Sequence, residues 1–471
     1  MKRKTILWTF LLLLTFILSA CVPKTFTSPT EIHLDPDDQV EQAVIAVDGN
    51  GRSHIAGVVN DRIIYYRTRY GKTITEFEML MGGSGTDWKQ YSPEIAALNN
   101  GAAYIVWVEQ RGGPEKFACW GYVPLYPPVG GYDRNCSPLD TTIQTTGNVR
   151  VVSNGYSVYA IYDRKYLTDG MGRIGALMYK ELTDPTNTGV AYDYINYYET
   201  GYIYGLDMVI DNADKLHIAI LDNYTVSVGP PYTDRLFYRS NYTTQADGTM
   251  TQGWLPIATG LSLGEDVDPS ISIYTDYEDG PRVGIASIWT TAGIDDIYID
   301  SCTVNGCDYV GSHLVNLPSS WNSHSVIDDL EIQGRGDELF LSFIGDNSPS
   351  AAPQVYYTDA FDTTIFMETS DGSATFKFDL EMVLLAPRPE SPTSSAMPAI
   401  SWGESDFVTA TYYSAGFLSD VVKISEDQCL DSLLSGDVGS NGYYYAGVWD
   451  ACSNTWFTTQ VWKTQLPIIV K

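Results

Sequence analysis

Acidic residues recur at an equivalent position in several similar sequence patterns, each directly after an apolar segment. The four acids are Glu109, Asp163, Asp222 and Asp346, and arginines lie beside the first two, at Arg111 and Arg164. A ring of such carboxylates and arginines would bind a sugar or a cation, and a carboxylate pair also serves as acid and base in glycoside hydrolysis. The competing interpretation is that each acid caps its own turn through the backbone.

The sequence lacks the motifs of several other enzyme classes. There is no G-x-S-x-G elbow, no H-E-x-x-H and no dinucleotide fingerprint. His54 and His217 occupy matching places at the start of an apolar segment, and we interpret them as packing histidines of a repeat. Acidic turns at residues 266–268 and 276–279 lack EF-hand spacing. We therefore expect no cofactor, with calcium as the one cation left open.

The elements that must position these residues form a repeat that runs through the chain. In each copy an apolar segment leads to a polar turn, a second segment rich in Val, Ile, Ala and aromatics follows, and a third contains Tyr or Phe. The turns contain Asn-Gly, Asp-Gly or acidic pairs, which tight hairpins favour. Equivalent positions in the first segments lie 50 to 70 residues apart, at Ile45, Ile95, Val149, Met208, Ile271, Leu330 and Ile400.

Alternation and β-branching predict that these segments are strands. The spacing leaves room for a fourth strand in each copy, so the sequence predicts an all-β fold, a seven-bladed β-propeller of four-stranded antiparallel blades over residues 39–471. The alternative is six blades plus a small β-sandwich built from one terminal copy. No long helix is expected after residue 20.

Several segments resemble the BNR-type, sialidase-like repeat propellers of secreted bacterial proteins. The resemblance lies in the segments His-Ile-Ala (54–56), Val-Trp (106–107) and Ile-Tyr-Tyr-Arg (64–67), and it covers roughly residues 40 to 425 at the level of the blade pattern. The family's Asp-box, Ser-x-Asp-x-Gly-x-Thr-Trp, is best matched by residues 369–376 (TSDGSATF), which lack the expected glycine. The resemblance implies a blade type, and an enzymatic activity does not follow from it.

The N-terminus has the layout of an export signal. Lys2, Arg3 and Lys4 precede an apolar run over residues 6–17 that is too short for a membrane-spanning helix. The sequence Leu-Ser-Ala-Cys at 18–21 resembles the lipobox of bacterial lipoproteins, which implies cleavage before Cys21 and acylation of its thiol. We expect a signal peptide at 1–20, a tether at 21–38, and an exported protein that a lipid anchors at the cell surface. Cleavage changes the net charge from −30 to −33.

The remaining cysteines fall into three pairs that are local in sequence. An exported chain with an even number of cysteines favours disulfides. Locality pairs them as Cys119–Cys136, Cys302–Cys307 and Cys429–Cys452, and zinc is disfavoured because the chain has no C-x-x-C and few histidines.

Composition narrows the partners. The chain of 471 residues has 28 Lys+Arg against 58 Asp+Glu, and nucleic acids and anionic lipid surfaces require clustered basic residues. The leading hypothesis is a tethered, non-catalytic, monomeric propeller that binds a glycan or a protein and touches the membrane only through its lipid. The alternative is an extracellular carbohydrate-active enzyme, a sialidase-like glycoside hydrolase or lyase. No catalytic residue is assigned.

Overall fold

Every regular element of the described chain is a β-strand, and the strands pair antiparallel. The structure is a computed structural model that describes residues 30–33, 40–69, 75–80, 88–113, 115–126, 137–139, 149–166, 174–184, 186, 188–194, 202–211, 214–224, 233–240, 255–263, 268–276, 280–291, 294–303, 306–307, 313–315, 317, 326–346, 352–360, 366–368, 377–385, 397–404, 407–414, 417–418, 422–423, 432–438, 443–450 and 455–463.

The first half of the chain forms four groups of four strands, each paired in chain order. The first group is β2 (Val40–Val47), β3 (Arg52–Val59), β4 (Arg62–Arg69) and β5 (Thr75–Leu80). The second is β6 (Trp88–Ala97), β7 (Ala103–Arg111), β8 (Lys116–Val123) and β9 (Ser137–Pro138). The third is β10 (Val149–Ser153), β11 (Val158–Tyr166), β12 (Ile174–Glu181) and β13 (Thr188–Tyr194). The fourth is β14 (Tyr202–Ile210), β15 (Leu216–Tyr224), β16 (Thr233–Ser240) and β17 (Leu255–Leu263).

The second half repeats the pattern with short outer strands. The fifth group is β18 (Ser270–Asp276), β19 (Gly280–Thr291), β20 (Ile294–Thr303), β21 (Gly306–Cys307) and β22 (His313–Leu314). The sixth is β23 (Val326–Arg335), β24 (Glu338–Asp346), β25 (Gln354–Asp359) and β26 (Phe366–Glu368). The seventh is β27 (Lys377–Leu385), β28 (Met397–Glu404), β29 (Phe407–Ser414), β30 (Phe417–Leu418) and β31 (Val422–Lys423). The eighth is β32 (Ser432–Val438), β33 (Tyr443–Asp450), β34 (Thr455–Lys463) and β1 (Thr30–His33).

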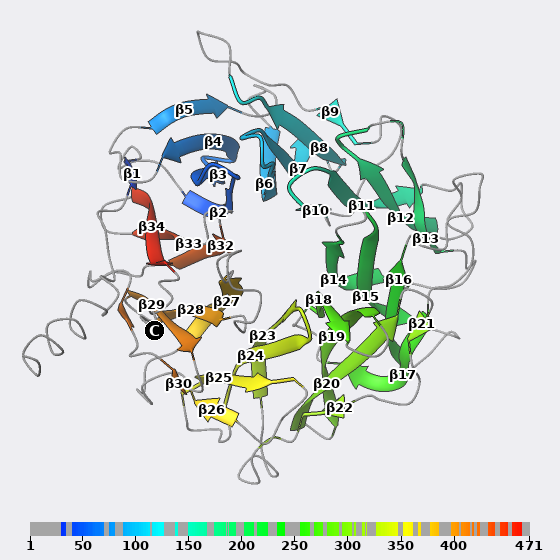
Figure 1. Ribbon diagram of the computed structural model, residues 1–471. Helices are drawn as coiled ribbons and strands as arrows, with labels where there is room; N and C mark the ends of the chain where they lie inside the picture. Colours follow the sequence, from blue (N-terminus) through cyan, green and yellow to red (C-terminus); the bar gives the residue numbers. More distant parts are fainter. Residues whose placement is uncertain are drawn as a thin grey trace, which may run out of the picture.

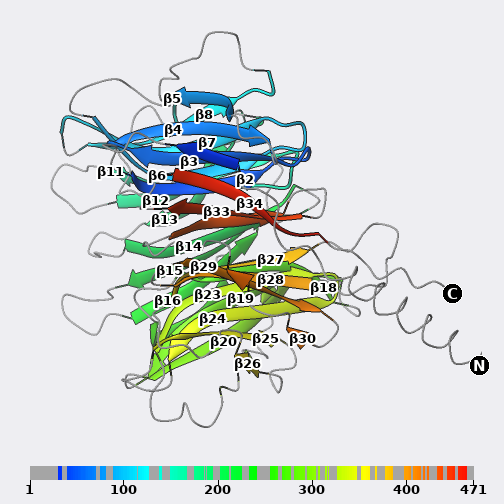
Figure 2. The same cartoon turned by 90° about the vertical axis from the view of Figure 1, so that its left-hand side faces the viewer.

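These groups surround a central axis, with the first strand of each group innermost (Figures 1 and 2). The fold is therefore a β-propeller, as the sequence predicts. The hydrogen-bonded sheets number seven because the fourth and fifth groups are joined through two residue pairs, Ser262 with Thr290 and Leu263 with Trp289. Counting that nine-stranded sheet as two units gives eight radial units among the described residues.

The prediction of seven units fails at the C-terminal end of the repeat. Six of the seven aligned positions lie on innermost strands, but Ile400 lies on β28, the second strand of its unit. Its partner across the ladder, Met382 on β27, is the residue that corresponds to Ile45. The strands β32 to β34 then form a further unit that the prediction did not include.

The ring is closed by both ends of the chain. Strand β1 pairs with β34 through four residue pairs, although residues 30–33 fall within the segment predicted as a tether. On the inner side, the backbone N–H of Val47 donates to Asp437 Oδ2 at 2.6 Å, which links the first unit to the eighth. The N-terminal strand β1 thus covers the outer edge of β34 and completes a four-stranded sheet.

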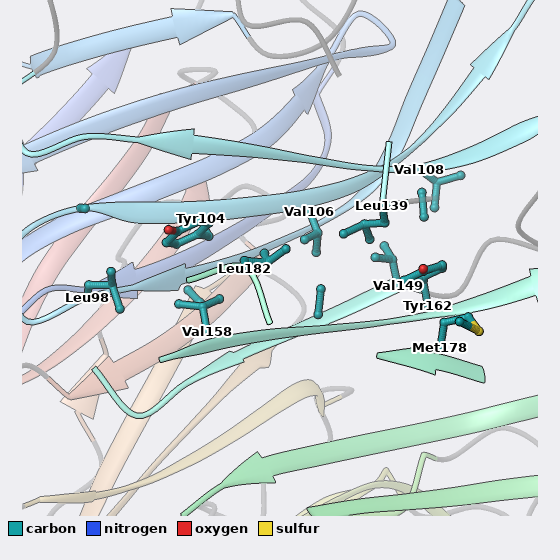
Figure 3. Packing of buried hydrophobic residues seen from close by; sticks show 14 residues of the cluster. Leu98, Tyr104, Val106, Val108, Leu139, Val149, Val158, Tyr162, Met178 and Leu182 are labelled. Atoms are coloured by element: carbon teal, nitrogen blue, oxygen red, sulfur yellow. The ribbon is translucent and has the colours of Figure 1, made fainter. Parts of the chain in front are cut away.

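The hydrophobic core lies between neighbouring sheets. Figure 3 shows one such layer, where Val106 and Tyr104 of the second unit pack against Val158 and Tyr162 of the third. Equivalent layers lie between the other successive sheets from the first to the seventh. Burial on both faces explains the nearly continuous apolar sequence of the second strands, since seven of the eight residues of β3 are buried.

The described residues include cysteines of two of the predicted disulfides. Cys119 on β8 and Cys302 on β20 are both disulfide-bonded, and Cys307 is the register partner of Cys302 across β20 and β21. Cys136, Cys429 and Cys452 lie outside the described residues, as do the predicted signal peptide and Cys21. In the described part of the chain, no helix has the length and hydropathy needed to cross a bilayer.

Candidate functional site

The innermost strands surround a cavity of about 450 Å³ on the propeller axis. Seven units contribute to it, from β2 through β27, and Figure 1 shows the innermost strands arranged around the centre of the ring. Apolar side chains such as Val44, Val151 and Met208 form part of the wall. Six carboxylates form most of the remainder: Glu94, Asp207, Asp268, Asp329, Glu331 and Glu381.

Arg150 on β10 is the one cation among the described lining residues. Its Nη1 donates to Glu94 Oε1 at 2.9 Å and its Nη2 donates to Asp268 Oδ2 at 3.0 Å. The carboxylate of Glu94 raises the pKa of Arg150, whereas burial raises the pKa of Glu94. The guanidinium thus binds one carboxylate from β6 and one from the segment before β18, and both of its terminal nitrogens are engaged.

The turns that follow the second and third innermost strands, which carry Glu94 and Arg150, contact each other. Gly155 has a φ of +89° and lies against the side chain of Asn99, so only glycine fits this turn without strain. The backbone N–H of Asn99 donates to the carbonyl oxygen of Gly155 at 2.9 Å. This contact joins the turn after β6 to the turn after β10.

Two of the lining aspartates join neighbouring units. Asp207 accepts hydrogen bonds from its own neighbour Met208 N–H and from Ile271 N–H of the next unit, both at 2.8 Å. Asp329 repeats the arrangement, with Leu330 N–H at 2.8 Å and Leu380 N–H of the next unit at 2.9 Å. Each carboxylate therefore satisfies two backbone donors at a joint between sheets.

The pKa values of this acidic group are raised. Burial raises the pKa of Asp207 to about 7, against the lowering effect of its two backbone hydrogen bonds. Burial also raises the pKa of Asp329. The pKa of Glu331 lies well above its ordinary value because of burial and the nearby charges of Glu381, Asp207 and Asp329. Of these carboxyls, Asp207 therefore changes its protonation state near neutral pH.

The arrangement suits a polar, uncharged ligand better than a metal ion. Carboxylates accept hydrogen bonds from hydroxyl groups, and the apolar wall provides surface for the carbon skeleton of a ligand. Among the described residues, no group of three or more His, Cys, Asp or Glu side chains has the geometry to hold a metal ion. One acid of the calcium candidate at 266–268, Asp268, is engaged by Arg150.

Glu109 and Arg111, two of the residues singled out in the sequence, form a buried network away from the cavity. Glu109 is fully buried, and it accepts hydrogen bonds from Gln90 Nε2 at 3.0 Å and Arg111 Nε at 2.7 Å. The Arg111 guanidinium lies over the rings of Trp88 and Phe117. Gln90 in turn accepts a hydrogen bond from Ile63 N–H at 2.7 Å, so this network joins the first and second sheets.

The other four candidates lie on second strands. Asp163 and Arg164 belong to β11, Asp222 to β15 and Asp346 to β24. The structure does not describe the side chains of Asp163, Arg164 and Asp222. None of the six predicted residues is among the described residues that line the cavity. Innermost strands line the axis, whereas these residues belong to the next strand outward.

The residues that do line the cavity have a sequence signal of their own. Glu94, Asp207 and Asp329 each directly precede an apolar residue on which the repeats align, namely Ile95, Met208 and Leu330. An acid repeated at this position on an innermost strand is the pattern that identifies the site.

The interpretation of His54 and His217 as packing residues of the repeat is confirmed. Both are buried, and Nδ1 of each is 2.7 Å from a tyrosine hydroxyl, Tyr65 for His54 and Tyr238 for His217. The Nε2 atoms face Asp48 at 3.3 Å and Asp211 at 3.6 Å. The first and fourth units thus contain the same buried Asp–His–Tyr arrangement.

Comparisons with known proteins give structural likenesses only. No family model matches the chain, and no curated protein matches its sequence. A protein of unknown function from Dyadobacter fermentans DSM 18053 aligns with a TM-score of 0.36 and 11% identity, over 71% of this chain and 98% of its own. The Trypanosoma rangeli sialidase aligns with a TM-score of 0.35 and 10% identity, and 92% of this chain covers 59% of that protein. The α-L-arabinofuranosidase Arb93A from Fusarium graminearum aligns with a TM-score of 0.34 and 13% identity, over 72% of this chain and 100% of its own. No function is carried over at this level of likeness.

Proposed function

We propose that this protein is an exported, lipid-anchored β-propeller that binds a neutral glycan in its axial cavity. The observation that carries the proposal is the cavity of about 450 Å³ with its mixed lining of carboxylates and apolar side chains. Its volume is within the range of small-molecule sites, roughly 300–1,000 Å³. Hydroxyl groups are the natural partners of carboxylate acceptors, and sugar rings have apolar faces that suit the remaining wall.

Charge argues against an anionic ligand. Arg150 is the one described cation in the lining, and both of its terminal nitrogens already donate to carboxylates. A carboxylated sugar requires a free arginine cluster, which the described lining lacks. The overall charge of −30 also opposes polyanions.

The binding proposal is tested with a glycan array probed by the chain from residue 30 onward. We expect signals from neutral oligosaccharides and a loss of roughly tenfold or more in the Val151→Trp variant, because indole fills space beside the axis. The Tyr156→Ala variant is the matched control on the same sheet, since Tyr156 is 76% exposed and does not line the cavity. An array without neutral-glycan signals, or unchanged binding by Val151→Trp, contradicts the proposal.

One observation favours a second candidate, a glycoside hydrolase. A carboxyl whose pKa is raised well above its ordinary value by burial and neighbouring carboxylates, such as Glu331, is suited to general acid catalysis when a second carboxylate lies nearby. A panel of fluorogenic glycosides tests this reaction. Turnover that falls at least a hundredfold in Glu331→Gln supports a hydrolase, and the absence of turnover on every neutral glycoside removes it.

Export and anchoring rest on the N-terminal sequence. We expect the mature chain to begin at Cys21 and to partition with membranes, and we expect Cys21→Ala to be released or to remain unprocessed. Mass spectrometry of the mature N-terminus and fractionation provide the measurement. A wild-type chain that starts elsewhere, with unchanged partition of the variant, contradicts the lipoprotein proposal.

A further inference from the structure

The polar atoms of the axial cavity are unequally divided between donors and acceptors. The lining contains six carboxylates, whereas its described cation, Arg150, donates to Glu94 and Asp268. The hydroxyl of Ser270 lies 3.4 Å from Glu331 Oε2 and accepts from Ile332 N–H at 3.0 Å. A wall of ionised carboxylates therefore presents acceptors and almost no donors to whatever enters.

A neutral glycan requires both kinds of group. Each hydroxyl donates and accepts, but ring and glycosidic oxygens only accept hydrogen bonds. A buried acceptor that loses its water and gains no donor costs about 1–3 kcal/mol. A protonated carboxyl provides such a donor and also removes one like charge from the group.

The geometry places Glu331 where a proton is best retained. Glu381 on β27, Asp207 on β14 and Asp329 on its own strand β23 all act on it electrostatically, and Ser270 faces it from β18. Asp207 in turn faces Arg150 from β10 and Asp268 from the segment before β18. Both oxygens of Asp207 accept backbone hydrogen bonds, which leaves Glu331 better suited to present a proton to the cavity.

We propose that glycan binding in the axial cavity is proton-linked: the Asp207–Glu331 group retains one proton, and the cavity holds a neutral glycan more tightly with that proton than without it. This inference rests on the proposed function and adds its regulation by pH. The raised pKa values of Asp207, about 7, and of Glu331 support it. Because the protonated form binds better, affinity decreases as pH rises through neutrality, and binding above that range takes up protons.

Isothermal titration calorimetry with cellohexaose, xylohexaose and α-1,5-arabinohexaose tests the proposal. We expect affinity at about pH 5.5 to exceed that at about pH 8.5 by roughly tenfold. Titrations near pH 8 in two buffers of different ionisation enthalpy count the protons, and we expect net uptake of up to about one per site.

Three variants distinguish the effect of the proton on affinity from the effect of the shape of the site. Glu331→Gln keeps the shape and provides a permanent amide donor, so its affinity should vary much less with pH than that of the wild type, with Asp207 as the remaining titrating group. Glu381→Gln, which removes a neighbouring charge, is expected to move the midpoint toward lower pH, and it replaces the first variant if that one fails to fold. Glu115→Gln removes an exposed acid outside the cavity and is the control, with the wild-type profile.

The outcomes are distinct. Binding by wild type that does not vary with pH, or that is tighter at about pH 8.5, overturns the proton linkage and leaves glycan binding intact. A pH profile that persists unchanged in both Glu331→Gln and Glu381→Gln also overturns it. No binding by any of the three probes at any pH, together with a silent array, rejects the proposed function and the inference with it.

Discussion

Replacing Arg150 by methionine is expected to lower the free energy of unfolding by about 2 kcal/mol at about pH 8. The substitution leaves Glu94 and Asp268 without their shared guanidinium in a cavity that contains four further carboxylates. Removing one partner of a fully buried ion pair costs about 3–5 kcal/mol. The loss expected here is smaller than that range because the side chains of Arg150, Glu94 and Asp268 are 39%, 28% and 47% exposed. Thermal melts measure the loss.

The pH dependence of this effect identifies its cause. Burial raises the pKa of Glu94 even beside Arg150, so without the arginine Glu94 becomes neutral at a still higher pH. The penalty of Arg150→Met should therefore shrink as pH falls, since a protonated Glu94 no longer requires a cation. Adding Glu94→Gln should recover part of the loss at about pH 8. A loss that is equal at all pH values and unaffected by Glu94→Gln shows that packing, not charge, is the contribution of Arg150.

The strands were predictable because alternation and turn residues are local signals. Ile45, Ile95, Val149, Met208, Ile271 and Leu330 all lie on innermost strands. The error at Ile400 has a physical reason: β28 is a second strand, buried like other second strands, with Ile400 and Trp402 fully enclosed. The run around Ile400 therefore has the composition of a repeat strand, although β27 also contains an unbroken apolar run at residues 382–385, next to Glu381, which lines the cavity.

The eighth unit also has a local turn signal in its sequence. Asn441-Gly442, a pair that favours tight hairpins, lies between the segment that becomes β32 and the aromatic-rich segment that becomes β33. The completion of that unit by residues 30–33 was not predictable in the same way, because it joins opposite ends of the chain. Four residues contain no periodicity long enough to indicate a partner strand.

The candidate residues chosen from the sequence lie on second strands, one strand outward from the residues that line the cavity, for a similar reason. Glu109 is conspicuous in sequence because it ends a long apolar run, yet such a run marks a strand enclosed between two sheets. The acids on innermost strands, Glu94 and Asp207 among them, interrupt shorter runs and are therefore less visible. Which strand of each unit faces the axis follows only from the packing of the whole ring.

The buried Asp–His–Tyr arrangements give the second large effect. His54→Leu is expected to destabilise the protein by about 2–3 kcal/mol at about pH 8, because the Tyr65 hydroxyl loses a partner at 2.7 Å and Asp48 loses the ring nitrogen that faces it at 3.3 Å. His217→Leu is the matched substitution in the fourth unit, where Tyr238 and Asp211 are the partners. The two losses should add, since the second and third units lie between the sites.

The sign of the pH effect separates these histidines from the axial acids. Burial lowers the pKa of His54 and of His217, so below the unfolded value of about 6.5 the unfolded chain binds more protons and stability decreases as pH falls. Asp207 acts in the opposite direction: its folded pKa of about 7 exceeds the unfolded value of about 3.9, so its contribution is lost as pH rises between the two. The destabilisation by His54→Leu should thus be largest at about pH 8 and smaller at about pH 5, as chemical denaturation at both pH values would show. A penalty that grows as pH falls would mean that His54 is charged in the folded protein and forms a true ion pair with Asp48.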